Sequence, residues 1–264
     1  MTLNYLRRGS GAPVVLVHGL GGSWRSWGTV LDDLATRREV VAPDLPGFGD
    51  SAPLVGEVSI ATLTDALEGF LDEHDLRDAD LVGSSMGARM VLELARRGVG
   101  RDVVALDPGG FWTSGEQRLF SVSLRASIAL VRRLDRALPM LLGNPVTRTA
   151  LLAQFSARPW ALPPDVPLTE LRRMISSPSF DDALGALTHG PTQQGMPRGT
   201  APGRITIGWG RFDGVTLPRQ AARAQAAFPD AEVHWFDKCG HFPQWDAPQE
   251  AVDLVLAATG ARTG

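Results

Sequence analysis

The pentapeptide Gly83-Ser84-Ser85-Met86-Gly87 has the G-x-S-x-G spacing of a nucleophilic serine. It lies between a short apolar run at residues 80–83 and a helical pattern at residues 86–97, which is the strand-turn-helix context that this motif requires. The flanking glycines are needed because a Cβ there would collide with the neighbouring strand or helix. We therefore predict Ser85 as the nucleophile of an acyl transfer, whereas Ser84 lacks this glycine spacing.

A serine hydroxyl is a weak nucleophile near neutral pH, so a base must stand within hydrogen-bond reach. The chain has five histidines, and His241 follows an apolar run at residues 233–236 in a glycine-containing loop. This position places it at the edge of the expected sheet where Ser85 also emerges, so we predict His241 as the general base. His18 follows the first apolar run and is better explained as a structural hydrogen bonder.

Two aspartates compete for the role of the acid that orients the histidine. Asp213 is preferred for its position, four residues after Trp209 in the loop that leaves the apolar run at residues 205–208, and it fits the chain order Ser, acid, His. Asp107 is the alternative because it directly follows the run at residues 103–106. The Pro108-Gly109-Gly110 sequence after it is also typical of a sharp turn, which explains Asp107 without catalysis.

The elements that position these residues alternate between apolar runs of strand length and amphipathic helical patterns. This alternation predicts parallel strands joined by crossover helices. Residues 111–198 differ, because they contain helical patterns and a proline cluster but no buried strand pattern. We predict a core of residues 1–110 and 199–264 with an inserted helical cap at residues 111–198. The expected strands lie at 14–17, 39–42, 80–83, 103–106, 205–208 and 233–236, and the expected core helices at 24–36, 60–74, 86–97, 217–228 and 248–258.

The chain resembles the α/β-hydrolase superfamily over nearly its whole length, in particular the serine-nucleophile members with a helical cap, such as esterases and lipases. The resemblance implies a mostly parallel sheet flanked by helices. Only residues 3–6 precede the Gly9 to Pro13 turn, so one of the family's two N-terminal strands is expected to be missing. The resemblance rests on the serine motif and on four further motifs: His18-Gly19-Leu20-Gly21-Gly22, Asp44-Leu45-Pro46-Gly47-Phe48-Gly49-Asp50-Ser51, Trp209-Gly210-Arg211-Phe212-Asp213 and Cys239-Gly240-His241-Phe242-Pro243.

An acyl transfer also needs hydrogen-bond donors directed at the developing oxyanion. Met86 follows the nucleophile at the start of the expected helix, so its backbone N–H is one predicted donor. The family resemblance places the second donor on the backbone N–H of Leu20.

The predicted reaction is hydrolysis of a small, mainly apolar carboxylic ester or lactone, and the sequence does not distinguish these two. Carbon–carbon bond hydrolases of the same superfamily are the second hypothesis, although they typically have Asn where this chain has Ser84 and Trp where it has Phe242. A ligand-binding or receptor protein that retains the triad with little turnover is the third. Aromatic residues that could line the substrate pocket are Trp112, Phe120, Phe155, Trp160 and Phe180 in the cap, and Phe242 beside the histidine.

Composition narrows the range of partners. With 26 basic and 29 acidic side chains, the formal charge is -3, and no run of like charges indicates a nucleic acid or a membrane surface. No metal-ligand spacing, phosphate loop or dinucleotide motif is present, so the sequence implies no metal and no cofactor. A single cysteine excludes an internal disulfide, so we expect a cytoplasmic protein acting on a small molecule, and its oligomeric state stays open.

Overall fold

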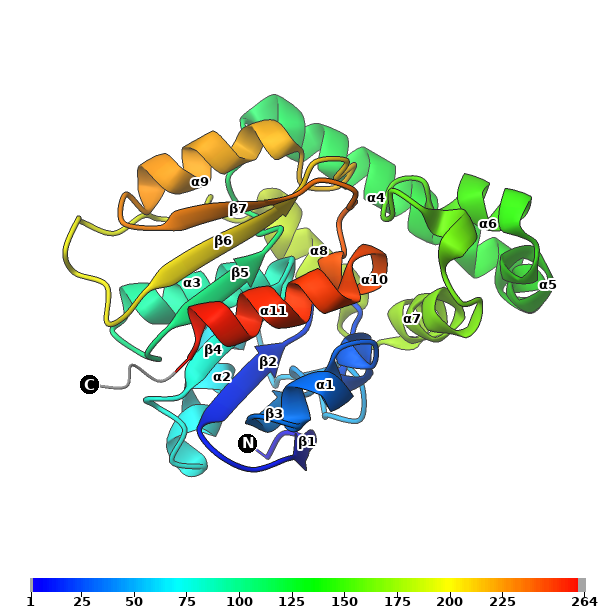
Figure 1. The fold of residues 1–264 in the computed structure, drawn as a ribbon. Helices are drawn as coiled ribbons and strands as arrows, with labels where there is room; N and C mark the ends of the chain where they lie inside the picture. The colour runs from blue at the N-terminus through cyan, green and yellow to red at the C-terminus, as the bar shows by residue number, and fades with distance from the viewer. Residues whose placement is uncertain (1, 261–264) are drawn as a thin grey trace.

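The computed structural model describes residues 2–260, and within them the strands form one seven-stranded sheet (Figure 1). The strand order is β1-β3-β2-β4-β5-β6-β7. Strand β1 is antiparallel to β3, and every other pair is parallel. The strands are β1 (Tyr5–Arg8), β2 (Pro13–Val17), β3 (Glu39–Pro43), β4 (Asp80–Ser84), β5 (Val103–Leu106), β6 (Ile205–Gly210) and β7 (Glu232–Phe236).

The central strands are buried on both faces, which explains why they are continuous apolar runs rather than alternating patterns. One face packs on α1 (Leu31–Ala35) and α11 (Pro248–Ala258). The opposite face packs on α2 (Ile60–Glu73), α3 (Met86–Arg96) and α9 (Ala221–Ala227). The chain therefore has the doubly covered parallel sheet of the expected α/β-hydrolase fold.

The register of the parallel strands brings their carboxyl ends to one edge of the sheet. Ser84 of β4 pairs with Leu106 of β5, and Leu106 pairs with Gly208 of β6. The residues that follow these strand ends therefore meet at that edge, where ligands of open α/β sheets bind.

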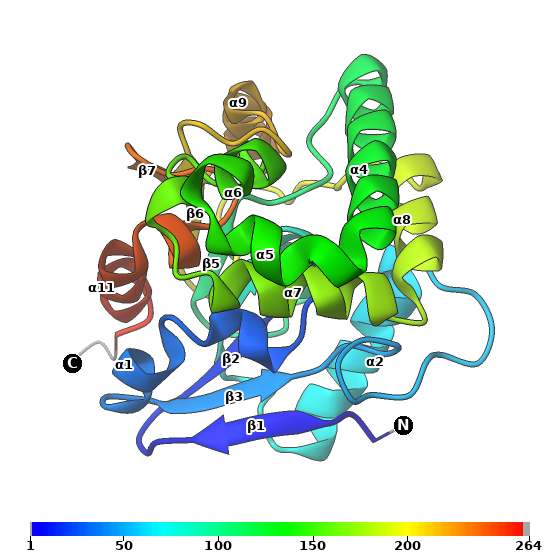
Figure 2. The same ribbon diagram turned by 90° about the vertical axis from the view of Figure 1, so that its right-hand side faces the viewer.

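A helical insertion separates β5 from β6 and lies beyond the carboxyl ends of the strands (Figures 1 and 2). Helix α4 begins with a capping box in which Thr113 and Glu116 satisfy each other's backbone amides. The predicted inserted helices are therefore present, whereas the boundaries of the cap at residues 111 and 198 stay a prediction. The helical insertion consists of α4 (Ser114–Leu134), α5 (Leu138–Gly143), α6 (Pro145–Leu152), α7 (Asp165–Ser176) and α8 (Phe180–His189), with short 3-10 turns at Asp135–Ala137 and Pro159–Ala161.

Two predicted helices differ from the structure. The helix expected at residues 24–36 is a 3-10 turn at Trp24–Trp27 followed by α1, with a break at Gly28 and Thr29, whose residue types have low helix propensity. The helix expected at residues 217–228 begins as a 3-10 turn at Pro218–Gln220 before α9.

At the N-terminal side, one strand precedes β2, as expected, but it runs from Tyr5 to Arg8 rather than over residues 3–6. Across the described part of the chain, every helix is too short or too polar to span a bilayer.

Candidate active site

Ser85 occupies the sharp turn between β4 and α3. Its backbone has φ +56° and ψ −112°, a conformation that residues other than glycine rarely adopt. A Cβ at Gly87 would lie 2.2 Å from the carbonyl oxygen of Val17, and a Cβ at Gly83 would lie 2.3 Å from the carbonyl oxygen of Gly87. Close packing of strand, turn and helix therefore explains both glycines of the motif.

His241 and Asp213 form a buried pair at the same edge of the sheet. The Nδ1–H of His241 donates to Asp213 Oδ2 at 2.9 Å, and both side chains are almost fully buried. Asp213 Oδ1 accepts from the backbone N–H groups of Val215 (2.7 Å) and Thr216 (3.0 Å), and Oδ2 also accepts from the Thr216 hydroxyl (2.6 Å). This network fixes the carboxylate and the imidazole, and it leaves Nε2 as the ring nitrogen available to another group.

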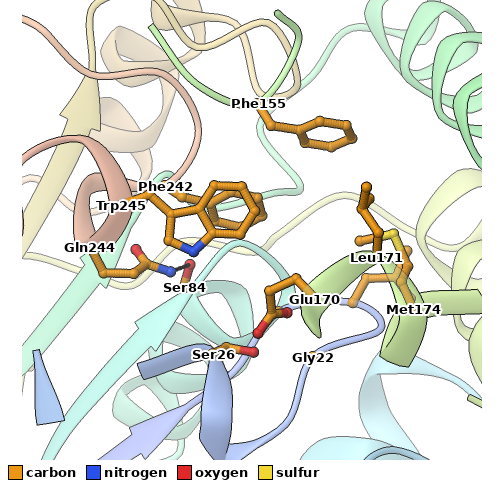
Figure 3. Close-up of a pocket in the computed structure, with 12 residues that line it drawn as sticks. Gly22, Ser26, Ser84, Phe155, Glu170, Leu171, Met174, Phe242, Gln244 and Trp245 are labelled. Atoms are coloured by element: carbon orange, nitrogen blue, oxygen red, sulfur yellow. Dashed lines mark hydrogen bonds between the residues drawn. The ribbon is translucent and has the colours of Figure 1, made fainter. Parts of the chain in front are cut away.

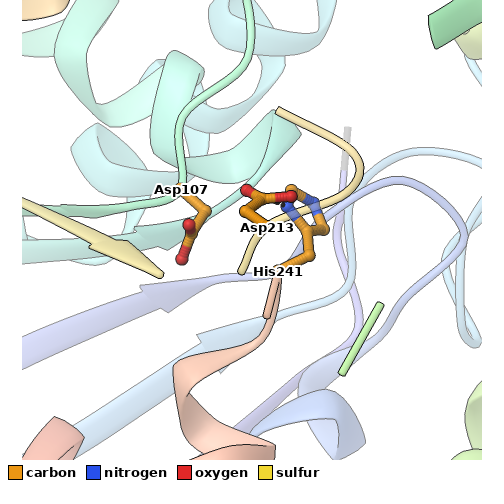
Figure 4. Close-up of side chains that lie close together, drawn as sticks. All are labelled: Asp107, Asp213 and His241. Atoms are coloured by element: carbon orange, nitrogen blue, oxygen red, sulfur yellow. Dashed lines mark hydrogen bonds and ion pairs between the residues drawn. The ribbon is translucent and has the colours of Figure 1, made fainter. Parts of the chain in front are cut away.

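Asp107 lies beside this pair, so the structure brings both candidate acids to one place (Figure 4). Its Oδ1 accepts from the Gly210 N–H at 2.8 Å, while its buried Oδ2 has no partner among residues 2–260. Burial raises the pKa of Asp107 well above its usual range, and the neighbouring charge of Asp213 raises it further. The neutral form of Asp107 is therefore favoured, and it is Asp213 that accepts the hydrogen bond from His241.

Asp107, Asp213 and His241 also present one potential ligand atom each within 4.8 Å of one another, a spacing that a metal ion would accept. However, the oxygens of Asp213 already accept four hydrogen bonds, which use the lone pairs that a metal would need. The donor set fits an oriented imidazole better than a metal centre.

The loop after β2 approaches Ser85 closely and is fixed by His18. The Nδ1–H of His18 donates to the Gly19 carbonyl (2.7 Å), and its Nε2 accepts from the Leu45 N–H (2.9 Å). Burial lowers the pKa of His18, which suits this neutral tautomer. A Cβ at Gly19 would lie 3.2 Å from the Ser85 Cβ. His18 is thus the structural hydrogen bonder expected from the sequence.

Both predicted oxyanion donors lie close to Ser85, because Met86 follows it in the chain and Leu20 lines the cavity that Ser85 faces. Leu20 follows Gly19 in a turn that is closed by the Gly22 N–H donating to the Gly19 carbonyl at 3.1 Å. Met86 is the first residue of α3, and the first N–H groups of a helix have no carbonyl partner within it. Their role as donors stays a prediction, and the positions suit it.

Ser85 and His241 face one small cavity, whose volume for water-sized occupants is about 30 Å³. In the described structure the Ser85 hydroxyl and His241 line the same cavity without a hydrogen bond between them. Catalytic hydrogen bonds of this kind are often long before substrate binds and shorten in the complex. The remaining walls are apolar and come from both the core and the helical insertion: Leu20, Phe120, Leu124, Phe155, Met174, Phe180, Leu187, Val215 and Phe242.

The predicted aromatic pocket residues divide into two groups. Phe120, Phe155, Phe180 and Phe242 line the cavity, and Phe155 stacks on Phe242 with ring centroids 6.1 Å apart. Trp112 is buried against Phe120 (5.0 Å) rather than lining this cavity. Trp160 is 55% exposed and also does not line it. Met174, Leu124, Leu187 and Val215 were not anticipated, since apolar helix positions do not reveal which neighbour they face.

A second cavity adjoins the first and shares Leu20, Phe155, Met174 and Phe242 with it. Figure 3 shows its polar side, where Glu170 of α7 lies near Ser26 and the amide of Gln244 lies near Ser84. Sequence reasoning considered Ser84 only as a rival nucleophile, and it did not anticipate Ser26, Glu170 or Gln244, which are far apart in the chain.

Comparison with known proteins places this geometry in context. Residues 14–254 match the family model described as "Alpha/beta hydrolase family". Over 98% of its length the chain is 29% identical to the dihydrolipoyllysine-residue acetyltransferase component of the acetoin cleaving system of Cupriavidus necator, and it spans 66% of that relative. It is 27% identical to the 2-hydroxy-6-oxo-2,4-heptadienoate hydrolase of Pseudomonas putida, covering 94% of this chain and 88% of the relative.

Among solved structures, the enol-lactonase of Burkholderia xenovorans superposes with a TM-score of 0.76 at 18% identity, covering 97% of this chain and 95% of that one. At this level of identity, the superposition shows a shared fold.

Proposed function

The chain belongs to the alpha/beta hydrolase family, and we propose that it is a serine hydrolase that cleaves a small carboxylic ester or lactone through an acyl-enzyme. The observation that carries the proposal is that Ser85 and His241 face one apolar cavity while Asp213 holds the other side of the imidazole. This is the arrangement of a serine nucleophile, its base and the acid that orients the base.

In the proposed mechanism, Ser85 Oγ attacks the substrate carbonyl and its proton passes to His241 Nε2. Asp213 stabilises the resulting imidazolium without taking the proton. The negative charge on the former carbonyl oxygen is stabilised by the N–H groups of Leu20 and Met86, each worth about 10²–10³ in rate. Collapse of this intermediate breaks the bond to the alcohol, which leaves with the proton from His241. Water then repeats the sequence on the acyl-enzyme and releases the acid.

The walls of the cavity favour a substrate whose reacting end is mainly apolar and small. Esters and lactones meet this requirement equally, because both present the same carboxylic ester group. They differ only in that the leaving alcohol of a lactone stays attached to the acid. No nucleic acid or membrane partner enters this proposal.

Carbon–carbon bond hydrolysis is the second candidate function. The similarity to the 2-hydroxy-6-oxo-2,4-heptadienoate hydrolase over 94% of this chain favours it. Ser84 and Phe242 stand where that group typically has Asn and Trp, which places ester cleavage first. Direct comparison of turnover on a p-nitrophenyl ester and on a 2-hydroxy-6-oxodienoate separates the two candidates.

The proposal is tested by covalent labelling of the folded protein with a fluorophosphonate, because an activated serine attacks phosphorus as it attacks a carbonyl. We expect a labelled peptide containing modified Ser85, and Ser85→Ala to remove the label and lower ester turnover by at least about 10⁴. Ser84→Ala is the matched control and keeps the label. Modification of Ser84 instead, or no labelling of the folded protein, contradicts the proposal. Labelling with negligible turnover of every ester favours the ligand-binding role.

A further inference from the structure

The second cavity, which adjoins that of Ser85 and His241, has one polar side that the proposed chemistry does not use, and we call it the polar cavity. Glu170 projects from α7 and is only 8% exposed, while Gln244 and Ser84 on the core are 2% and 1% exposed (Figure 3). The rest of the wall is largely apolar, with Phe155, Leu171, Met174, Phe242 and Trp245 around it. Buried polar groups in such surroundings require hydrogen-bond partners.

The hydrogen-bonding capacity of this polar side is only partly used. The Nε2 of Gln244 donates to Ser84 Oγ at 3.3 Å, while the buried Oε1 has no partner among residues 2–260. Glu170 has the Ser26 hydroxyl as its neighbour, and within the described residues no arginine or lysine pairs with it. Burial raises the pKa of Glu170 from 4.5 to about 7, and the hydrogen bond with Ser26 and the charge of Arg173 oppose the rise only in part. Glu170 is therefore a carboxyl that can donate or accept a hydrogen bond near neutral pH.

Glu170 also lies on a route from the surface to the nucleophile. An outer groove of about 250 Å³ shares Ser26, Glu170 and Trp245 with the polar cavity. The polar cavity in turn shares Leu20, Phe155, Met174 and Phe242 with the cavity of Ser85 and His241. A substrate whose carbonyl reaches Ser85 would therefore have its remote end near Glu170 and Gln244.

We propose that Glu170 and Gln244 bind a hydroxyl group of the substrate, so that the ester or lactone carries a hydroxyl remote from the bond that is cleaved. This inference rests on the proposed function and specifies its substrate class. A hydroxyl donates to Gln244 Oε1 or to ionised Glu170 and accepts from protonated Glu170, so it satisfies the site in either protonation state. A purely apolar substrate would leave Gln244 Oε1 unpaired and give Glu170 no partner beyond Ser26, and sites built in this way discriminate strongly against analogues that lack the hydroxyl.

The test compares pairs of esters that differ only by a terminal hydroxyl or methyl group. Ethyl 6-hydroxyhexanoate against ethyl heptanoate places the group on the acyl side, and 6-hydroxyhexyl butanoate against heptyl butanoate places it on the alcohol side. Longer homologues extend each series by one and two carbons. We expect kcat/KM, measured by acid release, to be at least about tenfold higher for the hydroxylated member of one pair.

Variants of Glu170 test whether this residue binds the substrate hydroxyl. Glu170→Met should lower the ratio of kcat/KM values within the preferred pair by at least about threefold, because it removes one of the two proposed partners and keeps the volume. Glu170→Gln retains a hydrogen-bonding side chain and should keep most of the preference. Glu73→Met, at an exposed position at the end of α2, is the matched control and should keep the full ratio. Because each ratio is taken within one variant, a partial loss of folded protein does not affect it.

Several outcomes overturn the inference. Equal kcat/KM values in every pair, or a hydroxyl preference that is undiminished in Glu170→Met, contradicts the inference while leaving the proposed function intact. A higher kcat/KM for ethyl 6-aminohexanoate than for ethyl 6-hydroxyhexanoate would show that the site binds a cation rather than a hydroxyl, and it also overturns the inference. Absence of both ester turnover and Ser85 labelling refutes the proposed function, and the inference with it.

Discussion

Replacement of Asp213 by asparagine tests the proposed chemistry most directly, because the structure dictates how the new amide must lie. The Oδ1 of Asp213 accepts from the N–H groups of Val215 and Thr216, so the asparagine carbonyl oxygen should remain there. The NH₂ group then faces Nδ1 of His241, where Asp213 Oδ2 now accepts at 2.9 Å. Two donors cannot face each other, so the imidazole must take the tautomer with its proton on Nε2.

That tautomer cannot accept the proton of Ser85, so turnover should fall by about 10⁴. This factor corresponds to about 5.4 kcal/mol of lost transition-state stabilisation. The geometry of the fold should be unchanged, because aspartate and asparagine have nearly the same shape. The assay is kcat for a p-nitrophenyl ester, with thermal unfolding as the check that the variant is folded.

Asp107→Asn is the matched control, since it makes the same chemical change in the neighbouring buried carboxyl. The raised pKa of Asp107 favours a neutral side chain, and asparagine resembles a neutral carboxyl more closely than a carboxylate. Its carbonyl oxygen can keep the hydrogen bond from the Gly210 N–H. We expect a loss below about tenfold, or about 1.4 kcal/mol. If Asp107→Asn abolishes turnover while Asp213→Asn is nearly silent, with both folded, Asp107 is the acid and the reasoning is refuted.

Two further predictions concern stability. Gly87→Ala should lower the free energy of unfolding by about 3 kcal/mol in urea denaturation, because its Cβ would meet the backbone oxygen of Val17 at 2.2 Å. Gly69→Ala, in helix α2 with no atom within 4 Å of the new Cβ, should instead add about 1 kcal/mol, and equal effects of the two would contradict this packing argument. Glu170→Gln should stabilise the protein increasingly as pH rises, because native Glu170 keeps its proton up to about pH 7 whereas the unfolded chain releases it near 4.5. The gain over wild type should grow by about 3 kcal/mol between pH 4.5 and 8, and a gain that stays constant with pH would show that Glu170 ionises normally.

The placement of Ser85, Asp213 and His241 at one edge could be predicted from the sequence because each follows a predicted strand. In a parallel sheet the carboxyl ends coincide, so residues more than 100 positions apart meet there without any knowledge of the loops. Asp107 obeys the same rule, which is why the sequence left two acids. The choice between them depends on side-chain hydrogen bonds and burial, which strand patterns do not encode.

The substrate side of the site could not be predicted in the same way. An amphipathic pattern in the insertion shows that a helix has a buried face, but not which loop of the core it covers. Glu170 therefore looked like an ordinary helix glutamate, although it is buried against a cavity that Ser26 also lines. Conversely, Trp160 was a candidate because of its size and apolarity, yet the short turn at Pro159–Ala161 leaves it 55% exposed.

The helical insertion is hydrogen-bonded to the loop of His241 through residues 155–157. The His241 N–H donates to the Phe155 carbonyl at 2.8 Å. Asp246 accepts from Gly240 N–H (2.8 Å) in that loop and from Ala157 N–H (2.7 Å) and the Ser156 hydroxyl (2.5 Å) in the insertion. Displacing residues 155–157 would therefore break these bonds and disturb the imidazole.

Helix α7, on the opposite wall, contributes Glu170, Leu171 and Met174 to the polar cavity. Met174 packs on the loop after β2 so closely that a Cβ at Gly21 would lie 2.6 Å from its Cγ. The side chains of α7 therefore shape one wall of the cavities, whereas residues 155–157 are hydrogen-bonded to the loop of His241. Substitutions in α7 should accordingly change substrate preference, and substitutions at residues 155–157 should change the position of the imidazole.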